Sequence, residues 1–286
     1  MIKVAKAFLL LVLASSIELS MSVVRGRFGF TSSILIGFIL FFVVAFIAFK
    51  LSRALTAHVI VVFMFIGVSV LLLPPRIVDF QGTMVSLPDY VFHSLGLFAA
   101  YCFYIVRSPA KWISVGLSIT LTLFMFFKGY SMWLHKLNYD NYTGRYFARL
   151  PEFTAEDGQG KIVSNVSIAG KLVLMDVWHT RCGACFRKFP ALNELYLKYK
   201  DNDKVRFIAM NYPLETDRPA QAYDMIAKRG YSFPVAKLKT VGLLDSLGVT
   251  VFPTTYLVDG KGIVVFKGSL DNAIKEFERS IKNETR

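Results

Sequence analysis

The sequence predicts two parts of different class: an α-helical transmembrane bundle, followed by an α/β domain in which helices flank a mixed sheet. The charges are divided in the same way. Residues 1–150 hold 13 of the 33 Lys and Arg but 4 of the 20 Asp and Glu, and most of the long apolar runs. Residues 151–286 hold the other 20 basic and 16 acidic residues, as an ordinary soluble domain does. We therefore predict a membrane domain at 1–134, a connector at 135–150 and a second domain at 151–286.

Five apolar runs predict the membrane helices: about 4–23, 32–50, 57–74, 90–106 and 111–134. Each approaches the ~20 residues that a helix needs to cross a bilayer. Glu18 is the one acidic residue within them. The first run has the basic start and apolar middle of a signal peptide, so we expect four or five transmembrane helices. The lipid bilayer is thus the first expected partner.

Both segment counts place residue 135 on the outer side of the membrane. Basic residues near the segment ends favour the same orientation by six on the inner side against four on the outer side. The pI of about 9.6 does not require nucleic acid as a partner, because the basic residues of the first part lie in short clusters between apolar runs. No stripe of aromatic and basic residues marks a nucleic-acid surface in the second part.

The membrane part has few residues that carry chemistry. Glu18, His58 and His93 each lie within about two helical turns of a segment end. We expect them to reach the membrane interface, although ionisable groups deep in a membrane are usually functional. Cys102 has no partner cysteine in this part and is expected to be a small apolar packing residue.

The second part alternates strand and helix patterns. The predicted elements are a buried strand at 171–178, a helix starting near Cys182, a strand at 204–211, a helix ended by Gly230, a short helix in "TVGLLDSLGV", a hairpin around "DGKG" and a closing helix in "NAIKEFERSIKN". Strands and helices in this order form a mixed sheet covered by helices.

The segment "DVWHTRCGACFRKFP" contains two of the three cysteines, Cys182 and Cys185. Haem attachment is excluded because Phe186, and not histidine, follows the second cysteine. Structural zinc needs about four ligands, and His179 is the one histidine between 151 and 286. A copper site formed by both thiolates and a distant group remains an alternative to a cycle between dithiol and disulfide.

Placement favours the dithiol cycle. Cys182 precedes the predicted helix, whose N-terminus favours a thiolate, and Arg181 adds a positive neighbour to which His179 could add another. Cys182 is therefore the expected nucleophile, and Cys185, one turn inward, would attack the mixed disulfide. Asp176 lies on an apolar strand, where burial raises a carboxyl pKa, and would accept the proton of Cys185.

This segment resembles the thioredoxin active site, in which Asp, Trp, Cys-Gly-x-Cys and a helix proline, here Pro190, fall at the same offsets. "GVTVFPTTYLVDGKG" is similar to the cis-proline loop of thioredoxins. The lead-in "FTAEDGQGKIVSNVSIAGK" resembles the membrane-attached TlpA/ResA-like branch. The resemblance covers roughly 152–282 and implies a thiol–disulfide oxidoreductase that acts on protein disulfides. It also implies no metal and no cofactor beyond a Cys182–Cys185 disulfide.

The resemblance further implies a substrate rim of Trp178, Phe252 and Pro253 around Cys182. It implies an extracytoplasmic domain on a bacterial cytoplasmic (inner) membrane. Because this branch is mostly reducing, we expect a reductant, and a membrane part without a dithiol requires a separate membrane electron donor. The alternative is a copper-handling or redox-sensing module that signals to its membrane bundle.

Two positions depart from the thioredoxin pattern. Arg181 stands where Trp is common, and Ala184 where Pro is common. With His179, they are expected to tune thiolate stability and the reduction potential.

Overall fold

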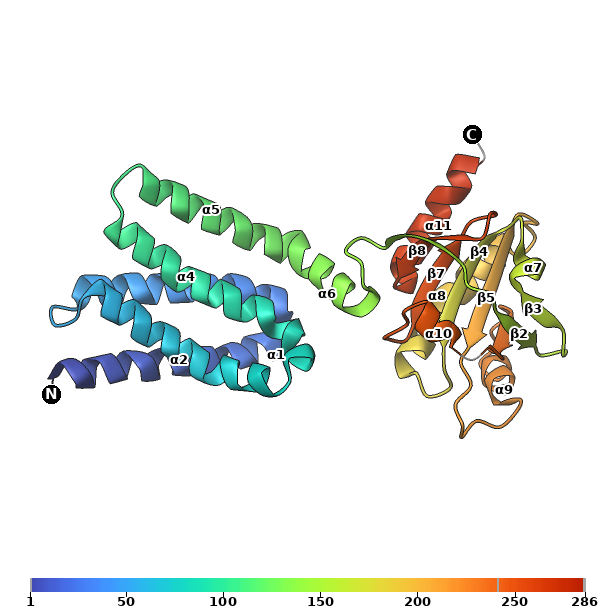
Figure 1. Ribbon diagram of the computed structural model, residues 1–286, viewed down its shortest axis with the longest axis horizontal. Coiled ribbons are helices and arrows are strands. Elements are labelled where there is room, and N and C mark those ends of the chain that lie inside the picture. Colours follow the sequence, from blue (N-terminus) through green and yellow to red (C-terminus); the bar gives the residue numbers. More distant parts are fainter. Residues whose placement is uncertain (1, 241, 285–286) are drawn as a thin grey trace. The chain divides into compact units, whose positions relative to one another are not determined.

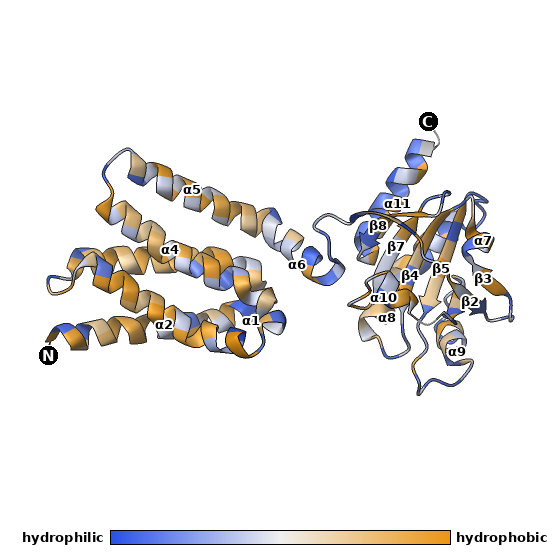
Figure 2. Ribbon diagram, viewed as in Figure 1, coloured by the Kyte–Doolittle hydropathy of each residue, from blue (hydrophilic) through white to orange (hydrophobic). Residues whose placement is uncertain are grey.

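The computed structural model describes residues 2–240 and 242–284. The chain divides into two compact units, residues 1–134 and 135–286. Figure 1 shows the first unit as a set of helices and the second as a sheet with helices packed on it. Figure 2 shows that apolar residues run along the helices of the first unit, whereas polar and apolar residues are mixed in the second. The fold class expected from the sequence is confirmed.

The first unit is helical throughout its regular structure. Its elements are α1 (Ile2–Leu51), α2 (Ala57–Val78), α3 (Phe80–Thr83), η1 (Met84–Ser86), α4 (Leu87–Ile105), α5 (Ala110–Phe124), η2 (Met125–Gly129) and α6 (Tyr130–Tyr139). The last three follow one another without a break, and α6 ends in the second unit.

A break at Gly29 divides α1 into two arms. Gly29 has φ 81° and ψ 172°, a conformation that is essentially restricted to glycine. The two arms run back alongside each other (Figure 1), and Ala14 of the first and Phe41 of the second lie in one core with α2 and α4. The arms correspond to the first two apolar runs of the sequence.

Three helices of the described residues are long and apolar enough to cross a membrane: Ile2–Leu51, Ala57–Val78 and Ala110–Tyr139. At 1.5 Å per residue, the 50 residues of α1 exceed twice the ~30 Å hydrocarbon thickness, so its two arms suffice for two crossings. The fourth predicted run, 90–106, corresponds to α4, which is not among the three. Asp89 and His93 lower its hydropathy, and both are buried within the unit.

The second unit is built on one eight-stranded sheet with the order β1-β8-β7-β4-β5-β6-β2-β3. Its strands are β1 (Arg145–Arg149), β2 (Thr154–Asp157), β3 (Ile162–Ser164), β4 (Leu172–Trp178), β5 (Val205–Asn211), β6 (Val235–Leu238), β7 (Thr254–Val258) and β8 (Ile263–Gly268). β4, β5 and β6 are parallel, and the other pairings are antiparallel. The helices are α7 (Asn165–Ile168), α8 (Gly183–Tyr199), α9 (Gln221–Ala227), α10 (Leu243–Ser246) and α11 (Leu270–Glu284).

The central strand β4 separates two cores, because successive side chains point to opposite faces. Leu172, Leu174 and Trp178 pack with α8, α9 and α11 on one face. Val173, Met175 and Val177 pack with α7 and α10 on the other. Asp176 is two residues from both Leu174 and Trp178 along β4, so its side chain lies on the same face of the sheet, the one that α8 covers.

The predicted connector at 135–150 is not an irregular linker throughout. Residues 145–149 form β1, which pairs with β8 at the edge of the sheet, and Leu150 N donates to Gly262 O at 2.9 Å. The strand carries an arginine at each end and alternates exposed with half-buried residues. Residues 145–149 therefore form a strand because they pair with the backbone of β8, and not because their own sequence has an apolar pattern.

Candidate active site

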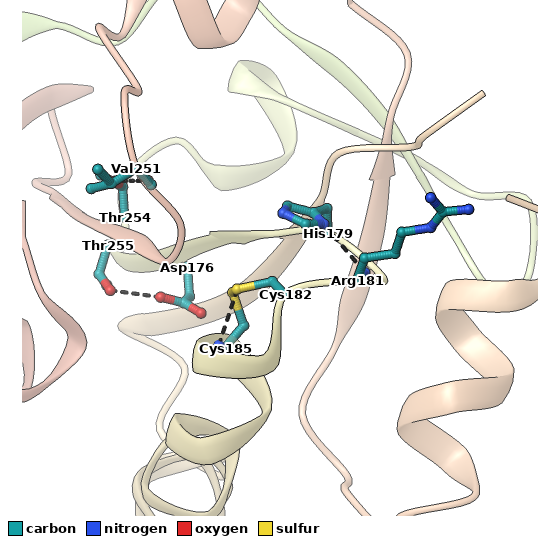
Figure 3. Close-up of a disulfide and its surroundings, with 8 residues drawn as sticks. All are labelled: Asp176, His179, Arg181, Cys182, Cys185, Val251, Thr254 and Thr255. Atoms are coloured by element: carbon teal, nitrogen blue, oxygen red, sulfur yellow. Dashed lines mark hydrogen bonds between the residues drawn. A yellow bond between two sulfur atoms is a disulfide. The ribbon is translucent and has the colours of Figure 1, made fainter. Parts of the chain in front are cut away.

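The two cysteines lie where β4 passes into α8 (Figure 3). Cys182 caps the helix: its Sγ accepts a hydrogen bond from Cys185 N at 3.1 Å. The two sulfur atoms form a disulfide. Cys182 is 6% exposed and Cys185 is 0% exposed, so Cys182 is the member of the pair that a substrate sulfur can approach. The unpaired N–H groups and dipole of α8 stabilise a thiolate at this position when the bond is reduced.

The Asp176 carboxylate lies between Thr255 and the disulfide in Figure 3. Thr255 Oγ1 donates to Asp176 Oδ1 at 2.6 Å, while Oδ2 is buried without a hydrogen-bond partner among the described residues. Complete burial raises the pKa of Asp176 from 3.8 to about 7, and the Thr255 hydrogen bond opposes part of that rise. A carboxyl group with this pKa can accept and return a proton near neutral pH.

Trp178 does not form the rim expected for it. Its side chain is 0% exposed and stands edge-to-face against Phe186 and Phe189, with ring centroids 5.8 and 5.2 Å away. The reason is the alternation of side chains along β4, which directs the indole under α8, into the same core as the cysteine pair. Trp178 therefore supports the pair from the core and is not available to a substrate in this conformation.

Phe252 and Pro253 remain half-buried, and the peptide bond between them is cis. The ring of Phe252 meets the His179 ring at 4.7 Å, edge to face, which brings this loop next to the segment before Cys182. Thr254 Oγ1 donates to Val251 O at 2.6 Å and closes the loop. The next residue, Thr255, holds Asp176, so one short segment contacts both sides of the site.

The three predicted tuning positions differ in their surroundings. His179 Nδ1 accepts a hydrogen bond from Arg181 N at 3.2 Å, and desolvation by burial lowers the His179 pKa. His179 is therefore neutral at neutral pH and does not supply the second positive charge expected from the sequence. Arg181 is exposed and donates to Thr216 Oγ1 at 2.8 Å. Ala184 packs against the core beside the disulfide, and the tuning roles stay predictions.

Two features of the site were missed by the sequence interpretation. The first is Thr255, whose hydroxyl moderates the Asp176 pKa. The second is Asp217, which accepts hydrogen bonds from Thr180 Oγ1 at 2.6 Å and from Leu214 N at 3.0 Å and so holds the loop after β5 to the segment before Cys182. The two polar residues directly after Pro253 were a sequence signal for Thr255. No local signal in the sequence identified Asp217.

Within residues 2–240 and 242–284, no group of three or more His, Cys, Asp and Glu side chains is placed to hold a metal ion. The expectation that the site works without a metal or other cofactor stays a prediction. What the described groups supply is a thiol pair, a buried carboxyl group and a helix N-terminus.

The AhpC/TSA family model matches residues 148–267 of the chain. Thiol-disulfide oxidoreductase ResA of Bacillus thuringiensis is 36% identical over 115 residues, which are 40% of this chain and 64% of that protein. The chain thus spans less than two thirds of this relative. ResA of Halalkalibacterium halodurans is 31% identical over 135 residues, which are 46% of this chain and 74% of that protein.

Two solved structures are similar at 25% identity and a TM-score of 0.41 each. One is the thioredoxin domain of a thiol-disulfide oxidoreductase from Bacteroides vulgatus, with 48% of this chain and 96% of that one covered. The other is a thiol:disulfide interchange protein from Bacteroides sp., with 46% and 88% covered. From the extent of the match to the ResA proteins, the chain belongs, through its C-terminal domain, to the thioredoxin-like family of ResA thiol-disulfide oxidoreductases.

Proposed function

We propose that the chain is a membrane-anchored thiol–disulfide oxidoreductase that reduces protein disulfides outside a bacterial cytoplasmic membrane. The observation that carries this proposal is the placement of Cys182 at the N-terminus of α8, with the buried Asp176 beside the pair (Figure 3). A packing or structural disulfide does not require a carboxyl group next to it, and burying one there costs stability. Family membership supports the same chemistry.

The reaction consumes one dithiol and one disulfide. The Cys182 thiolate attacks a sulfur of the substrate disulfide, forming a mixed disulfide and releasing the first substrate thiolate, which takes a proton from water. The Cys185 thiol then passes its proton to Asp176 and attacks Cys182 Sγ. This step breaks the mixed disulfide, releases the second substrate thiolate and leaves the Cys182–Cys185 disulfide. Two electrons have moved from the protein to the substrate.

The substrate chain would lie along the loop of Phe252 and Pro253 and pair with it as an extended segment. The dithiol must be regenerated after each turnover. Cys102 is the one cysteine of the first unit, so that unit has no dithiol to pass electrons onward. A separate membrane electron donor is therefore part of the proposal.

The full chain in detergent, reduced with dithiothreitol, is expected to reduce the disulfides of insulin with repeated turnover. The same preparation is assayed for bound copper and zinc. Turnover in protein free of both metals supports the proposal. Stoichiometric copper on the cysteine pair with no reduction of insulin would instead establish a copper-handling module.

The outward orientation of the second unit has its own test. After reduction, a membrane-impermeant maleimide added to intact cells is expected to label the chain when Cys102 is serine and Cys182 is present. The double variant with Cys102→Ser and Cys182→Ser provides the background, because Cys185 is fully buried. Labelling that appears only after the cells are lysed would place the domain in the cytoplasm and contradict the proposed location.

A further inference from the structure

A network of buried ionisable groups links the two arms of α1 to α4 in the first unit. Glu18, Asp89 and His93 are 1%, 0% and 0% exposed. The sequence placed Glu18 and His93 near segment ends, where they would reach the interface, and that expectation is wrong. The break at Gly29 folds the two arms of α1 around the start of α4, so these groups face one another inside the unit and are shielded from solvent and lipid.

The ring of His93 has an acceptor on each side. His93 Nδ1 lies 2.6 Å from Glu18 Oε2, and His93 Nε2 lies 3.1 Å from the backbone oxygen of Ser33. A carbonyl oxygen only accepts, so Nε2 must carry a proton. The contact with Glu18 then needs another proton, which resides on Nδ1 or on the carboxyl group. The pair thus holds one proton beyond those of a neutral histidine and an ionised glutamate.

Arg25 joins this pair to Asp89. Its Nη1 donates to Glu18 Oε1 and to Asp89 Oδ2, at 2.9 Å in each case. Ser33 Oγ also donates to Asp89 Oδ2 at 3.0 Å, while Asp89 Oδ1 is buried with no hydrogen-bond partner among the described residues. The unpartnered oxygen is a free acceptor within this network. Arg25, whose side chain is 17% exposed, marks the place where this network reaches the surface.

The surrounding charges oppose one another. The two carboxylates favour the extra proton. Arg25 and, from α2, Arg76 disfavour it, since Arg76 is within electrostatic range of Glu18 and Asp89. Tyr90 of α4 lies within electrostatic range of Arg76, and Tyr130 of α6 within range of Asp89.

The chain leaves room for the His93 ring. A Cβ atom at Gly37 would lie 2.0 Å from His93 Nε2, and the ring packs at 5.5 Å from that of Phe41. Glycine at position 37 therefore lets the second arm of α1 approach the ring closely enough for the Ser33 carbonyl to accept its proton. Gly37 and the two hydrogen-bond acceptors together fix the place of the His93 ring.

We propose that the Glu18–His93 pair is a proton-exchange site of the helical unit. It holds one proton between Glu18 Oε2 and His93 Nδ1 and exchanges it, by way of the Asp89 carboxylate, with water that reaches the network beside Arg25. Intramembrane ionisable residues that face a bundle interior are typical of proton pathways. The site lies at the end of the unit from which the chain continues to the second unit, where Trp133 Nε1 donates to Met84 O at 2.9 Å just before α4. The proposal is independent of the dithiol chemistry.

The test is nuclear magnetic resonance of the full chain, labelled with ¹⁵N-histidine, in lipid nanodiscs, with infrared spectroscopy of its carboxyl groups. His93 is expected to show either two protonated ring nitrogens or one together with a protonated carboxyl band, as its two hydrogen bonds require. Glu18→Gln should remove this proton, and the His93→Gln spectrum assigns the ring. His58→Gln is the matched control, because the His58 ring is exposed and bonds Tyr101.

The rate of hydrogen–deuterium exchange is a second measurement. It is made on the wild-type chain, so the test does not require that any variant fold. The shared proton is expected to exchange with deuterium much faster than the backbone amides of α4. Gly37→Ala, which keeps every titratable group but displaces the ring, should abolish the shared proton. A His93 ring with an unprotonated Nε2, or a proton that exchanges as slowly as those amides, would overturn the proposal and leave a structural hydrogen bond.

Discussion

Replacing Cys182 by serine is expected to abolish disulfide reduction, by at least about 10⁴-fold, in the full chain. The hydroxyl of serine stays protonated at the N-terminus of α8, where a thiol ionises, so no nucleophile is formed. The substitution replaces one sulfur atom by oxygen in a residue that is 6% exposed and should leave the fold intact. Insulin reduction by the variant and the wild type, at equal concentration, measures the effect.

Two matched variants make this result specific. Cys102→Ser removes the half-buried cysteine of the first unit and should leave the rate unchanged. Cys185→Ser keeps the nucleophile but cannot resolve, so it should stop after the first attack and accumulate mixed disulfides with substrate proteins. Wild-type activity in Cys182→Ser, or mixed disulfides that form through Cys185 in that variant, would reverse the assignment of nucleophile and resolving cysteine.

The elements that bear the cysteine pair could be predicted because their signals are local. β4 is a continuous apolar run with one carboxylate, and α8 shows apolar residues at helical spacing from Phe189 onward. By contrast, β2, β3 and β6 are three or four residues long, and β1 is rich in arginine. Strands of this kind form because they pair with a neighbouring strand, and no periodicity in their own sequence indicates that pairing.

The parts of the candidate site that escaped prediction depend on contacts between distant segments. Thr255 meets Asp176 only because β7 pairs antiparallel with β4 in a register that sets the two residues opposite each other. The burial of Trp178 follows from the same sheet, since its alternate position on β4 turns its ring under α8. In the first unit, Asp89 lies 64 residues from Arg25, and the two meet because α4 packs against α1.

The Asp176→Asn variant is expected to be slower but more stable than the wild type. The pKa of Asp176 is about 7, so the carboxylate that accepts the Cys185 proton is formed as pH rises through about 7. The rate of the resolving step in the wild type should therefore increase across that range. Asparagine cannot accept the proton, so the variant should lose this rise and about 10²-fold in the rate of that step.

The stability change has the opposite sign. A pKa raised from 3.8 to about 7 means that the folded state keeps the Asp176 proton between these values while the unfolded state has lost it. Stability therefore falls as pH rises through this window, and the loss persists above it. At about 1.4 kcal/mol per pKa unit, the loss amounts to roughly 4 kcal/mol. Asparagine has no charge to bury, so the free energy of unfolding of the variant at pH 8 should exceed that of the wild type by a comparable amount.

Thr255→Val separates the proton-transfer role from simple packing. The Thr255 hydrogen bond lowers the Asp176 pKa, so its removal should shift the pH midpoint of the resolving step upward, by up to about one unit, without eliminating the rise. Asp201→Asn, at an exposed position after α8, should change neither the midpoint nor the stability. Resolution kinetics of a preformed mixed disulfide, followed by stopped flow from pH 5 to about 9, give the midpoint. If Asp176→Asn kept the wild-type pH profile while gaining stability, Asp176 would be a buried charge without a part in the proton transfer.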